Sequence, residues 1–261
     1  MGDAGCVDVE GFVRDGHVVI RRAFDADVAA ACREVIWSVL ESHGIDRADR
    51  GTWRAPKVDA ACPPGGPFAA AASGAVLVGA IDALIGAGRW QAPIPAHGGT
   101  VKFPFEDWPG DTGWHIEGNR WGGEDYWTDA RSTGRGLTAF FLFSDVGRND
   151  APTRLVSGSH LSVPPILAAA GPAGMSGGAV AERLRPSVLH RPVTHATGRA
   201  GDVYLLHPFL VHTATWPHTG TTPRMMSQPG IAVPDGFDLD GTDPSPVAEA
   251  IVRGLTPTRN R

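Results

Sequence analysis

The chain divides into an N-terminal part with helical spacing of apolar residues and a longer part built from short apolar runs. Asp25 is suited to cap a helix that ends at Gly44, and the apolar residues between them recur at helical spacing: Val28, Cys32, Val35, Ile36, Val39 and Leu40. A second helix is predicted from Ser73 to Leu84 by the same criterion. The segment 45–67 is polar and rich in Pro and Gly, so we expect a long loop there.

From residue 98 the pattern changes to runs of strand length separated by turn residues. Together with 18–20, the predicted strands are 100–105, 114–117, 137–144, 153–156, 190–194, 203–206, 210–215 and 224–233. Short strands at this spacing are typical of a β-sandwich or barrel. The stretch 161–186 is predicted to be an insertion with one helical turn, and the polar tail after Asp235 is expected to be partly disordered.

We therefore expect a single domain over residues 1–261, mainly β with flanking helices. The N-terminal helices would occupy about 25–90 and the β core about 98–233.

Composition and charge narrow the classes of partner. The net charge of -5 argues against nucleic acid, because neutralising phosphates requires a basic surface. No apolar run reaches membrane-spanning length, and the N-terminus lacks the basic and apolar segments of a secretory signal. Cys6, Cys32 and Cys62 have no CxxC spacing, so we interpret them as reduced thiols in a cytoplasmic protein.

Two residues with metal-ligand side chains lie two positions apart, His115 and Glu117. On a strand, side chains at this spacing point to the same face, so both can reach one ion. Either His207 or His212 can supply a third ligand. Two imidazoles and one carboxylate can cap one face of iron(II) and leave the opposite face open for chemistry.

The choice between the two later histidines depends on the expected strand pairing. A hairpin centred near His218 would set His212 opposite Arg224, and an arginine beside the metal can hold a carboxylate-bearing cosubstrate. His207 precedes a proline and is interpreted as a buried turn histidine. Four histidines in polar or turn contexts are expected at the surface: His17, His43, His97 and His218. Three others are candidates to line a pocket: His160, His190 and His195.

At these residues the chain resembles the phytanoyl-CoA dioxygenase family of iron(II)/2-oxoglutarate oxygenases. The resemblance is carried, in the expected order, by residues 10–20, 101–104 leading into 114–117, 137–160, and 201–212 with 223–224. In the third stretch, Asn-Asp-Ala-Pro-Thr-Arg-Leu-Val-Ser-Gly-Ser-His (149–160) is similar to the family's Asn-Gly-x-Thr-x-x-x-Pro-Gly-Ser-His.

The resemblance implies a double-stranded β-helix (jelly-roll) core and iron(II) and 2-oxoglutarate as cofactors. It implies that His115, Glu117 and His212 are the iron ligands. Further residues are implied as cosubstrate contacts. Arg224 would bind the far carboxylate of 2-oxoglutarate, and Thr138 and Phe140 lie on a strand that would line its pocket. Thr213 lies beside a position where the family often has a hydroxyl, and Lys102 matches a Lys-Pro-type position. The family usually has Asp where this chain has Glu117, whereas its halogenases have a small residue there. The carboxylate therefore favours hydroxylation over halogenation.

The loop Asn119–Gly136 directly follows the first two ligands, so it can act as a lid or be a structural surface loop. Its candidate substrate contacts are Arg120, Trp121 and Trp127. We expect a dioxygenase that uses O2 to hydroxylate a small-molecule metabolite, in keeping with a bacterial biosynthetic pathway. Two alternatives remain open. One is a cupin-type metal enzyme without 2-oxoglutarate, which would not need Arg224, and the other is a non-catalytic jelly-roll binding protein.

Overall fold

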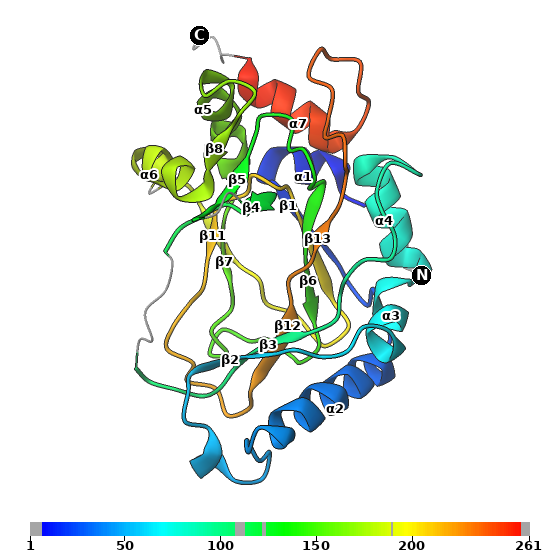
Figure 1. Cartoon of the computed structure of the whole chain (residues 1–261), viewed down its shortest axis with the longest axis vertical. Helices are drawn as coiled ribbons and strands as arrows, with labels where there is room; N and C mark the ends of the chain where they lie inside the picture. The colour runs from blue at the N-terminus through cyan, green and yellow to red at the C-terminus, as the bar shows by residue number, and fades with distance from the viewer. Residues whose placement is uncertain (1–6, 108–112, 122–123, 189, 257–261) are drawn as a thin grey trace.

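Two β-sheets face each other at the centre of the structure, a computed structural model that describes residues 7–107, 113–121, 124–188 and 190–256 (Figure 1). The major sheet has the order β1-β10-β6-β12-β3-β2, with β13 also pairing with β6, and the minor sheet has the order β11-β7-β9. The major-sheet strands are β1 (His17–Ile20), β2 (Lys57–Ala60), β3 (Gly99–Lys102), β6 (Leu137–Leu142), β10 (Val203–Leu206), β12 (Arg224–Ser227) and β13 (Gly230–Ile231). The minor-sheet strands are β7 (Arg154–Val156), β9 (Val193–His195) and β11 (His212–Thr213). The predicted mainly β fold with a double-stranded β-helix core is confirmed.

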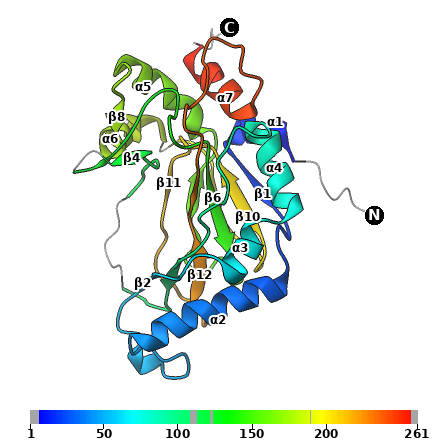
Figure 2. The same cartoon turned by 45° about the vertical axis from the view of Figure 1, so that its right-hand side comes forward.

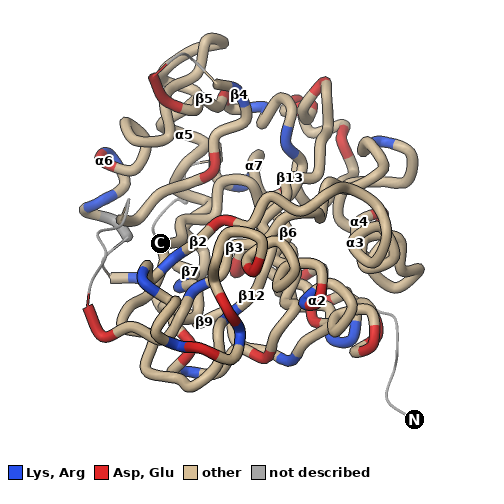
Figure 3. Tube along the Cα trace, turned by 60° about the horizontal axis from the view of Figure 1, so that its bottom comes forward, with Lys and Arg blue, Asp and Glu red and all other residues tan. Residues whose placement is uncertain are grey.

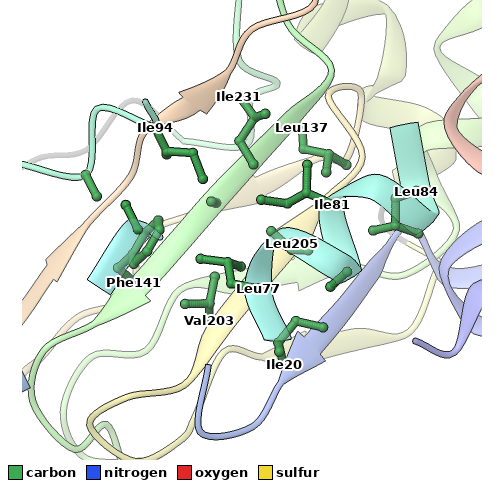
Figure 4. Close-up of a cluster of buried hydrophobic side chains, with 14 of the residues drawn as sticks. Ile20, Leu77, Ile81, Leu84, Ile94, Leu137, Phe141, Val203, Leu205 and Ile231 are labelled. Carbon is green, nitrogen blue, oxygen red and sulfur yellow. The ribbon is translucent and has the colours of Figure 1, made fainter. Parts of the chain in front are cut away.

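Alternation along the central strands separates an inner core from an outer one. Phe140 and Leu142 of β6 point between the sheets, where they join Leu155 of β7, and Tyr204 and Leu206 of β10. The intervening residues pack on the opposite face of the major sheet against a helix (Figure 4): Leu137 and Phe141 of β6 and Val203 and Leu205 of β10 meet Leu77, Ile81 and Leu84. Every residue of β6 is buried, so this strand is the centre of both cores.

Three N-terminal helices cover the outer face of the major sheet. They are α2 (Ala26–Ser42), α3 (Gly66–Ala72) and α4 (Ala75–Ile85), and Figure 2 shows α2 running along the lower end of the sheet. The predicted helix 25–44 is confirmed as α2 and the predicted helix 73–84 as α4, whereas α3, which ends at Ala72 just before it, was not predicted. The segment 45–67 is not only a loop, since it contains the one-turn helix η1 (Arg50–Thr52) and edge strand β2.

The described residues include no single helix that is long and apolar enough to cross a bilayer. Helices α3 and α4 reach that length and composition only together, as a pair bent by 51°. Their buried residues pack into the outer core of the sheet.

Both regions predicted to lack regular structure are folded. The stretch 161–186 lies largely within η2 (Ser159–Ser162), α5 (Pro164–Ala169), β8 (Met175–Ser176) and α6 (Gly177–Val188). The tail forms α7 (Pro246–Leu255), whose Val247 and Ile251 are fully buried and which lies beside α1 (Val9–Asp15) (Figure 1). The Ser245 side chain caps α7 by accepting a hydrogen bond from the amide of Ala248. The expectations of a single helical turn and of a partly disordered tail were therefore wrong for residues 161–186 and 246–255.

Candidate metal centre

Three side chains from distant parts of the chain converge at one end of the minor sheet. His115, Glu117 and His212 each offer one ligand atom, and these atoms all lie within 4.8 Å of one another. Nε2 of His212 is 3.3 Å from Oε1 of Glu117. Neighbouring ligand atoms in an octahedral site are about 3 Å apart when each metal bond is about 2.1 Å, so the donor set fits a divalent first-row metal.

The backbone brings the two histidines together. The amide of His115 donates to the carbonyl of His212 at 3.0 Å, and the amide of His212 donates back at 2.9 Å. The predicted strand 114–117 is reduced to this single antiparallel bridge, which adds His115 to the free edge of β11. The imidazole ring centres are consequently 4.5 Å apart.

Each histidine is also fixed in orientation by a carbonyl two residues earlier. Nδ1 of His115 lies 2.8 Å from the oxygen of Gly113, and Nδ1 of His212 lies 2.9 Å from the oxygen of Leu210. A carbonyl oxygen only accepts, so Nδ1 carries the proton in both rings, which leaves Nε2 available as the atom that binds a metal when the ring is neutral. This is the tautomer that a metal ligand requires.

The predicted pairing of His212 with Arg224 was wrong. His212 lies opposite Leu155 in the minor sheet, whereas Arg224 lies opposite Lys102 in the major sheet. The chain crosses from one sheet to the other between residues 213 and 224 and does not form a local hairpin. His212 is distinguished from His207 by its contact with Glu117.

His207 is buried in a different environment. Its Nδ1 accepts a hydrogen bond from the amide of Phe209 at 3.1 Å, which leaves Nε2 to donate to the carbonyl of Val247 at 3.3 Å. Both ring nitrogens are therefore used by the fold. Burial lowers the pKa of His207 well below its usual value, which keeps the ring neutral.

Glu117 is ionised despite its partial burial. Burial raises the pKa of this carboxyl, but nearby positive charge lowers it to about 2 when no metal is bound: that of His212, whose Nε2 donates to Glu117 when the ring is protonated, and those of Arg135 and His115. Phe140 lies edge-on to the ring of His212 with centres 5.7 Å apart, and thus packs against this ligand from β6. Thr138 is buried one pleat further along the same face.

Two buried cations lie side by side on the inner face of the major sheet. Arg224 and Lys102 are direct cross-strand partners and are only 3% and 2% exposed. Nη1 of Arg224 donates to the carbonyl of Ala151, whereas its Nε is buried without a partner. Burial lowers the pKa of Arg224 to about 10, an effect that nearby Asp150 opposes, so the guanidinium remains charged at neutral pH.

Lys102 contacts a carbonyl and an aromatic ring. Its Nζ donates to the carbonyl of Thr215 at 3.4 Å and lies 4.3 Å from the ring centre of Trp216. None of the ion pairs among the described residues includes Arg224. Burying the Arg224 guanidinium without a counter-charge is unfavourable unless an anion joins it, so Arg224 is suited to bind a carboxylate.

Other sequence candidates lie away from this cluster. Thr213 follows His212 on β11 and pairs with Arg154, so strand alternation directs its side chain to the opposite face of the minor sheet. His218, expected at the surface, is only 1% exposed, and its Nδ1 accepts a hydrogen bond from the amide of Gly220.

The loop after the ligands is structured where it is described. Strands β4 (Arg120–Trp121) and β5 (Tyr126–Thr128) form a small sheet with β8. The Arg120 guanidinium donates to the carbonyl of Ala173, and Trp127 lies opposite Arg120 and Ser176. Trp121 is 58% exposed. Among the aromatic side chains that the structure describes, its ring contacts only that of Tyr126, which it meets edge-on.

A cavity of about 700 Å³ adjoins the first two ligands and is closed on one side by α6. Its lining residues include His115, Glu117, Trp114, Ile116, Tyr126, Ala181, Leu184 and Val211. The three candidate substrate residues, Arg120, Trp121 and Trp127, are not among them. The α6 contribution was missed because Gly177, Gly178 and Pro186 obscure the helical spacing of Val180 and Leu184.

Comparison with known proteins is consistent with this architecture. Residues 12–226 match the phytanoyl-CoA dioxygenase (PhyH) family. The epimerase SnoN from nogalamycin biosynthesis, solved with Fe3+, alpha-ketoglutarate and nogalamycin RO, is 20% identical, with a TM-score of 0.58 and coverage of 91% of each chain. EctD from S. alaskensis with bound Fe is 18% identical, with a TM-score of 0.58 and coverage of 95% of this chain and 82% of EctD.

The alpha-ketoglutarate-dependent carbocyclase SnoK, also from nogalamycin biosynthesis, is 21% identical, with a TM-score of 0.57 and coverage of 86% of this chain and 82% of SnoK. At these identities the structural likeness shows the fold. No curated protein matches the chain. Because the family match spans most of the sequence, the chain belongs to the phytanoyl-CoA dioxygenase family and is an iron- and 2-oxoglutarate-dependent oxygenase.

Proposed function

We propose that this oxygenase hydroxylates a small-molecule metabolite, with iron(II) held by His115, Glu117 and His212. The observation that carries the proposal is the convergence of these three ligand atoms within 4.8 Å, with both histidines in the ligand tautomer. Arg224 and Lys102 would receive the far carboxylate of 2-oxoglutarate, as their shared burial and the unpartnered Nε of Arg224 suggest.

Iron(II) and 2-oxoglutarate, when bound, supply the O2-activating chemistry, and the chain supplies position and environment. Gly113 and Leu210 hold the Nδ1 protons of the ligand histidines, which keeps Nε2 aimed at the metal. Glu117 contributes a negative charge that persists to low pH. Phe140 covers the ring of His212 and helps to exclude water from that side.

The cavity beside His115 and Glu117 is the proposed substrate site. Trp114, Ile116 and Leu184 give it apolar walls, which suits a carbon skeleton better than a highly charged molecule. A small-molecule substrate agrees with the structural neighbours, since SnoN was solved with nogalamycin RO and EctD with 5-hydroxyectoine. We propose Ala181 and Leu184 of α6, in place of Arg120, Trp121 and Trp127, as substrate contacts.

Hydroxylation is proposed over halogenation because Glu117 keeps a carboxylate in the ligand set. No nucleic-acid or membrane partner is proposed. The net charge is -5, and acidic and basic residues are interspersed along the strands and loops around β2, β3 and β12 in the view of Figure 3.

A cytoplasmic location is proposed from the cysteines. Cys32 and Cys62 are both free and buried, and burial raises the pKa of Cys32 to about 12, so its thiol stays protonated. Cys6 lies outside the described residues.

Anaerobic reconstitution tests the proposed cofactor site. The metal-free full chain is mixed with iron(II) and 2-oxoglutarate, and the weak visible charge-transfer band of the chelate is followed by absorbance. We expect one chelate per chain and release of succinate when O2 is admitted. Absence of the band in the wild type would overturn the cosubstrate assignment. A band of unchanged affinity in Arg224→Gln would favour a different cosubstrate anchor.

A further inference from the structure

Arg135 is a partly buried arginine whose neighbours connect it to the proposed metal site. It immediately precedes the glycine before β6 and belongs to the loop Asn119–Gly136, in which Arg120 was the arginine expected to contact the substrate. Its side chain instead turns inward. Nη2 donates to the carbonyl of Gly118, the residue after Glu117, at 3.1 Å, and Nη1 reaches Oγ1 of Thr138 at 3.3 Å.

The fold leaves space specifically for this guanidinium. Gly230 on β13 lies opposite Thr138, and a Cβ at Gly230 would be 2.7 Å from Nη1 and 2.9 Å from Cζ of Arg135. The absence of a side chain at residue 230 therefore lets the guanidinium lie against the strand. Gly118 is constrained in the same way, since a Cβ there would collide with Tyr126.

Arg135 is not held by an ordinary ion pair. None of the ion pairs among the described residues includes it, and its Nε is buried without a hydrogen-bond partner. A partly buried guanidinium whose hydrogen bonds go only to neutral acceptors is unfavourable, and the charge of Glu117 is what offsets this cost. Its two hydrogen bonds connect the segment that carries Glu117 to Thr138, the second residue of the central strand β6.

We infer that Arg135 is a positioning residue: it holds the Glu117–Gly118 backbone against β6 so that the carboxylate meets the metal between His115 and His212. The inference rests on the proposed metal site and extends it to a residue that does not touch the metal. The longer glutamate side chain has one more rotatable bond than aspartate, so fixing its backbone limits the carboxylate's freedom.

The test measures metal binding by the metal-free full chain, with cobalt(II) as the probe because its visible bands report coordination. Arg135→Gln is expected to bind cobalt(II) about 10–100-fold more weakly than wild type with altered band positions, which is the usual effect of losing an outer-sphere partner. The matched control is Arg131→Gln, which removes an exposed arginine of the same loop that pairs with Asp238. This control is expected to bind like wild type.

Two further variants distinguish the loss of the two Arg135 hydrogen bonds from the loss of its charge and from misfolding. Gly230→Ala keeps the guanidinium but displaces it, so it should also weaken cobalt(II) binding, and it serves as the test if Arg135→Gln does not fold. Arg135→Lys keeps the charge but loses the planar guanidinium that donates to two acceptors at once. This variant is expected to bind cobalt(II) more weakly than wild type. Full recovery of affinity by Arg135→Lys would overturn the bridging role.

The outcomes distinguish the inference from the function beneath it. Wild-type affinity and bands in folded Arg135→Gln or Gly230→Ala would overturn the positioning role alone. Failure of the wild-type chain to bind cobalt(II) or iron(II) would overturn the proposed metal site, and this inference with it. Thermal unfolding of each metal-free variant establishes that it is folded.

Discussion

The main chains of His115 and His212 hold each other by a reciprocal pair of hydrogen bonds, 3.0 Å in one direction and 2.9 Å in the other. The proximity of the two imidazoles is thus set by backbone atoms that side-chain substitution leaves in place. Variants of either ring should remove a ligand atom while preserving the bridge. The metal site can therefore be dissected by mutation without dismantling the fold around it.

His212→Gln is expected to weaken iron(II) binding by more than about a hundredfold, because loss of even an outer-sphere partner costs about 10–100-fold. Anaerobic titration measures the affinity. His207→Gln is the matched control: it should bind iron(II) at wild-type stoichiometry but be less stable by about 1–3 kcal/mol, since its two buried hydrogen bonds are disturbed. The opposite result, with iron lost only in the His207 variant, would show that the third ligand is misassigned.

Arg224→Gln should separate cosubstrate binding from metal binding. Removing the buried cation is expected to weaken 2-oxoglutarate binding by about 2 kcal/mol or more, which is ~30-fold, while iron(II) affinity changes little. Calorimetric titration of the iron-loaded chain measures 2-oxoglutarate binding, and titration of the metal-free chain measures iron(II) binding. Arg21→Gln is a suitable control because Arg21 directly follows β1, which β10 and β6 separate from the strand of Arg224, pairs with Asp202 and is largely exposed. Equal affinities for 2-oxoglutarate in wild type and Arg224→Gln would support a metal enzyme that does not use this cosubstrate.

Acid should destabilise the metal-free protein through a buried histidine outside the metal site. Burial lowers the pKa of His160 to about 4, although its hydrogen bond with the carbonyl of Val13 opposes the shift. The unfolded chain binds a proton at this residue near pH 6.5, whereas the folded chain does not until about pH 4. Stability attributable to His160 is therefore complete above about pH 6.5 and is lost as the pH falls toward 4, by roughly 2–3 kcal/mol.

Urea unfolding in chelator at several pH values measures this loss. In His160→Gln the free energy of unfolding should fall less steeply between pH 6.5 and 4 than in wild type. A parallel pH dependence in the two proteins would assign the acid sensitivity to other groups.

The C-terminal helix should contribute to global stability. Ile251 of α7 is fully buried, so Ile251→Ala is expected to lower the free energy of unfolding by about 2–5 kcal/mol. Val252→Ala, at the half-buried next position, should have a smaller effect. Denaturant unfolding compares the two, and no loss in Ile251→Ala would indicate that α7 is dispensable for the fold.

The sequence predicted those elements whose local pattern was uncontested. Helix α2 has apolar residues at helical spacing and Asp25 at its N-cap position. Strand β10 was predicted at its full extent because an apolar run follows a glycine turn. Strand β2 was missed because it is a sheet-edge strand with only Ala60 buried, which leaves no apolar alternation. Helix α7 was missed because its short run of small and apolar residues lies in a polar tail and gains its stability from tertiary packing.

The candidate ligands were predictable from residue types and spacing, but their neighbours were not. The pairing of His212 with Arg224 assumed that successive strands form a hairpin, whereas the chain changes sheets between them. The direction of Arg135 depends on the space left by Gly230, a residue far away in sequence. Contacts that form only when the two sheets pack together leave no local pattern in the sequence from which to predict them.

The edge strand β1 pairs with β10, so the first strand of the chain completes the sheet with one from its last third. During synthesis, residues 17–20 emerge long before their partners at 203–206, and His115 likewise emerges long before His212. Such non-local pairing makes folding slow relative to proteins of local topology. A nascent chain therefore cannot assemble the proposed three-residue iron site until most of the protein has left the ribosome, so we expect metal loading to be a late event that follows closure of both sheets.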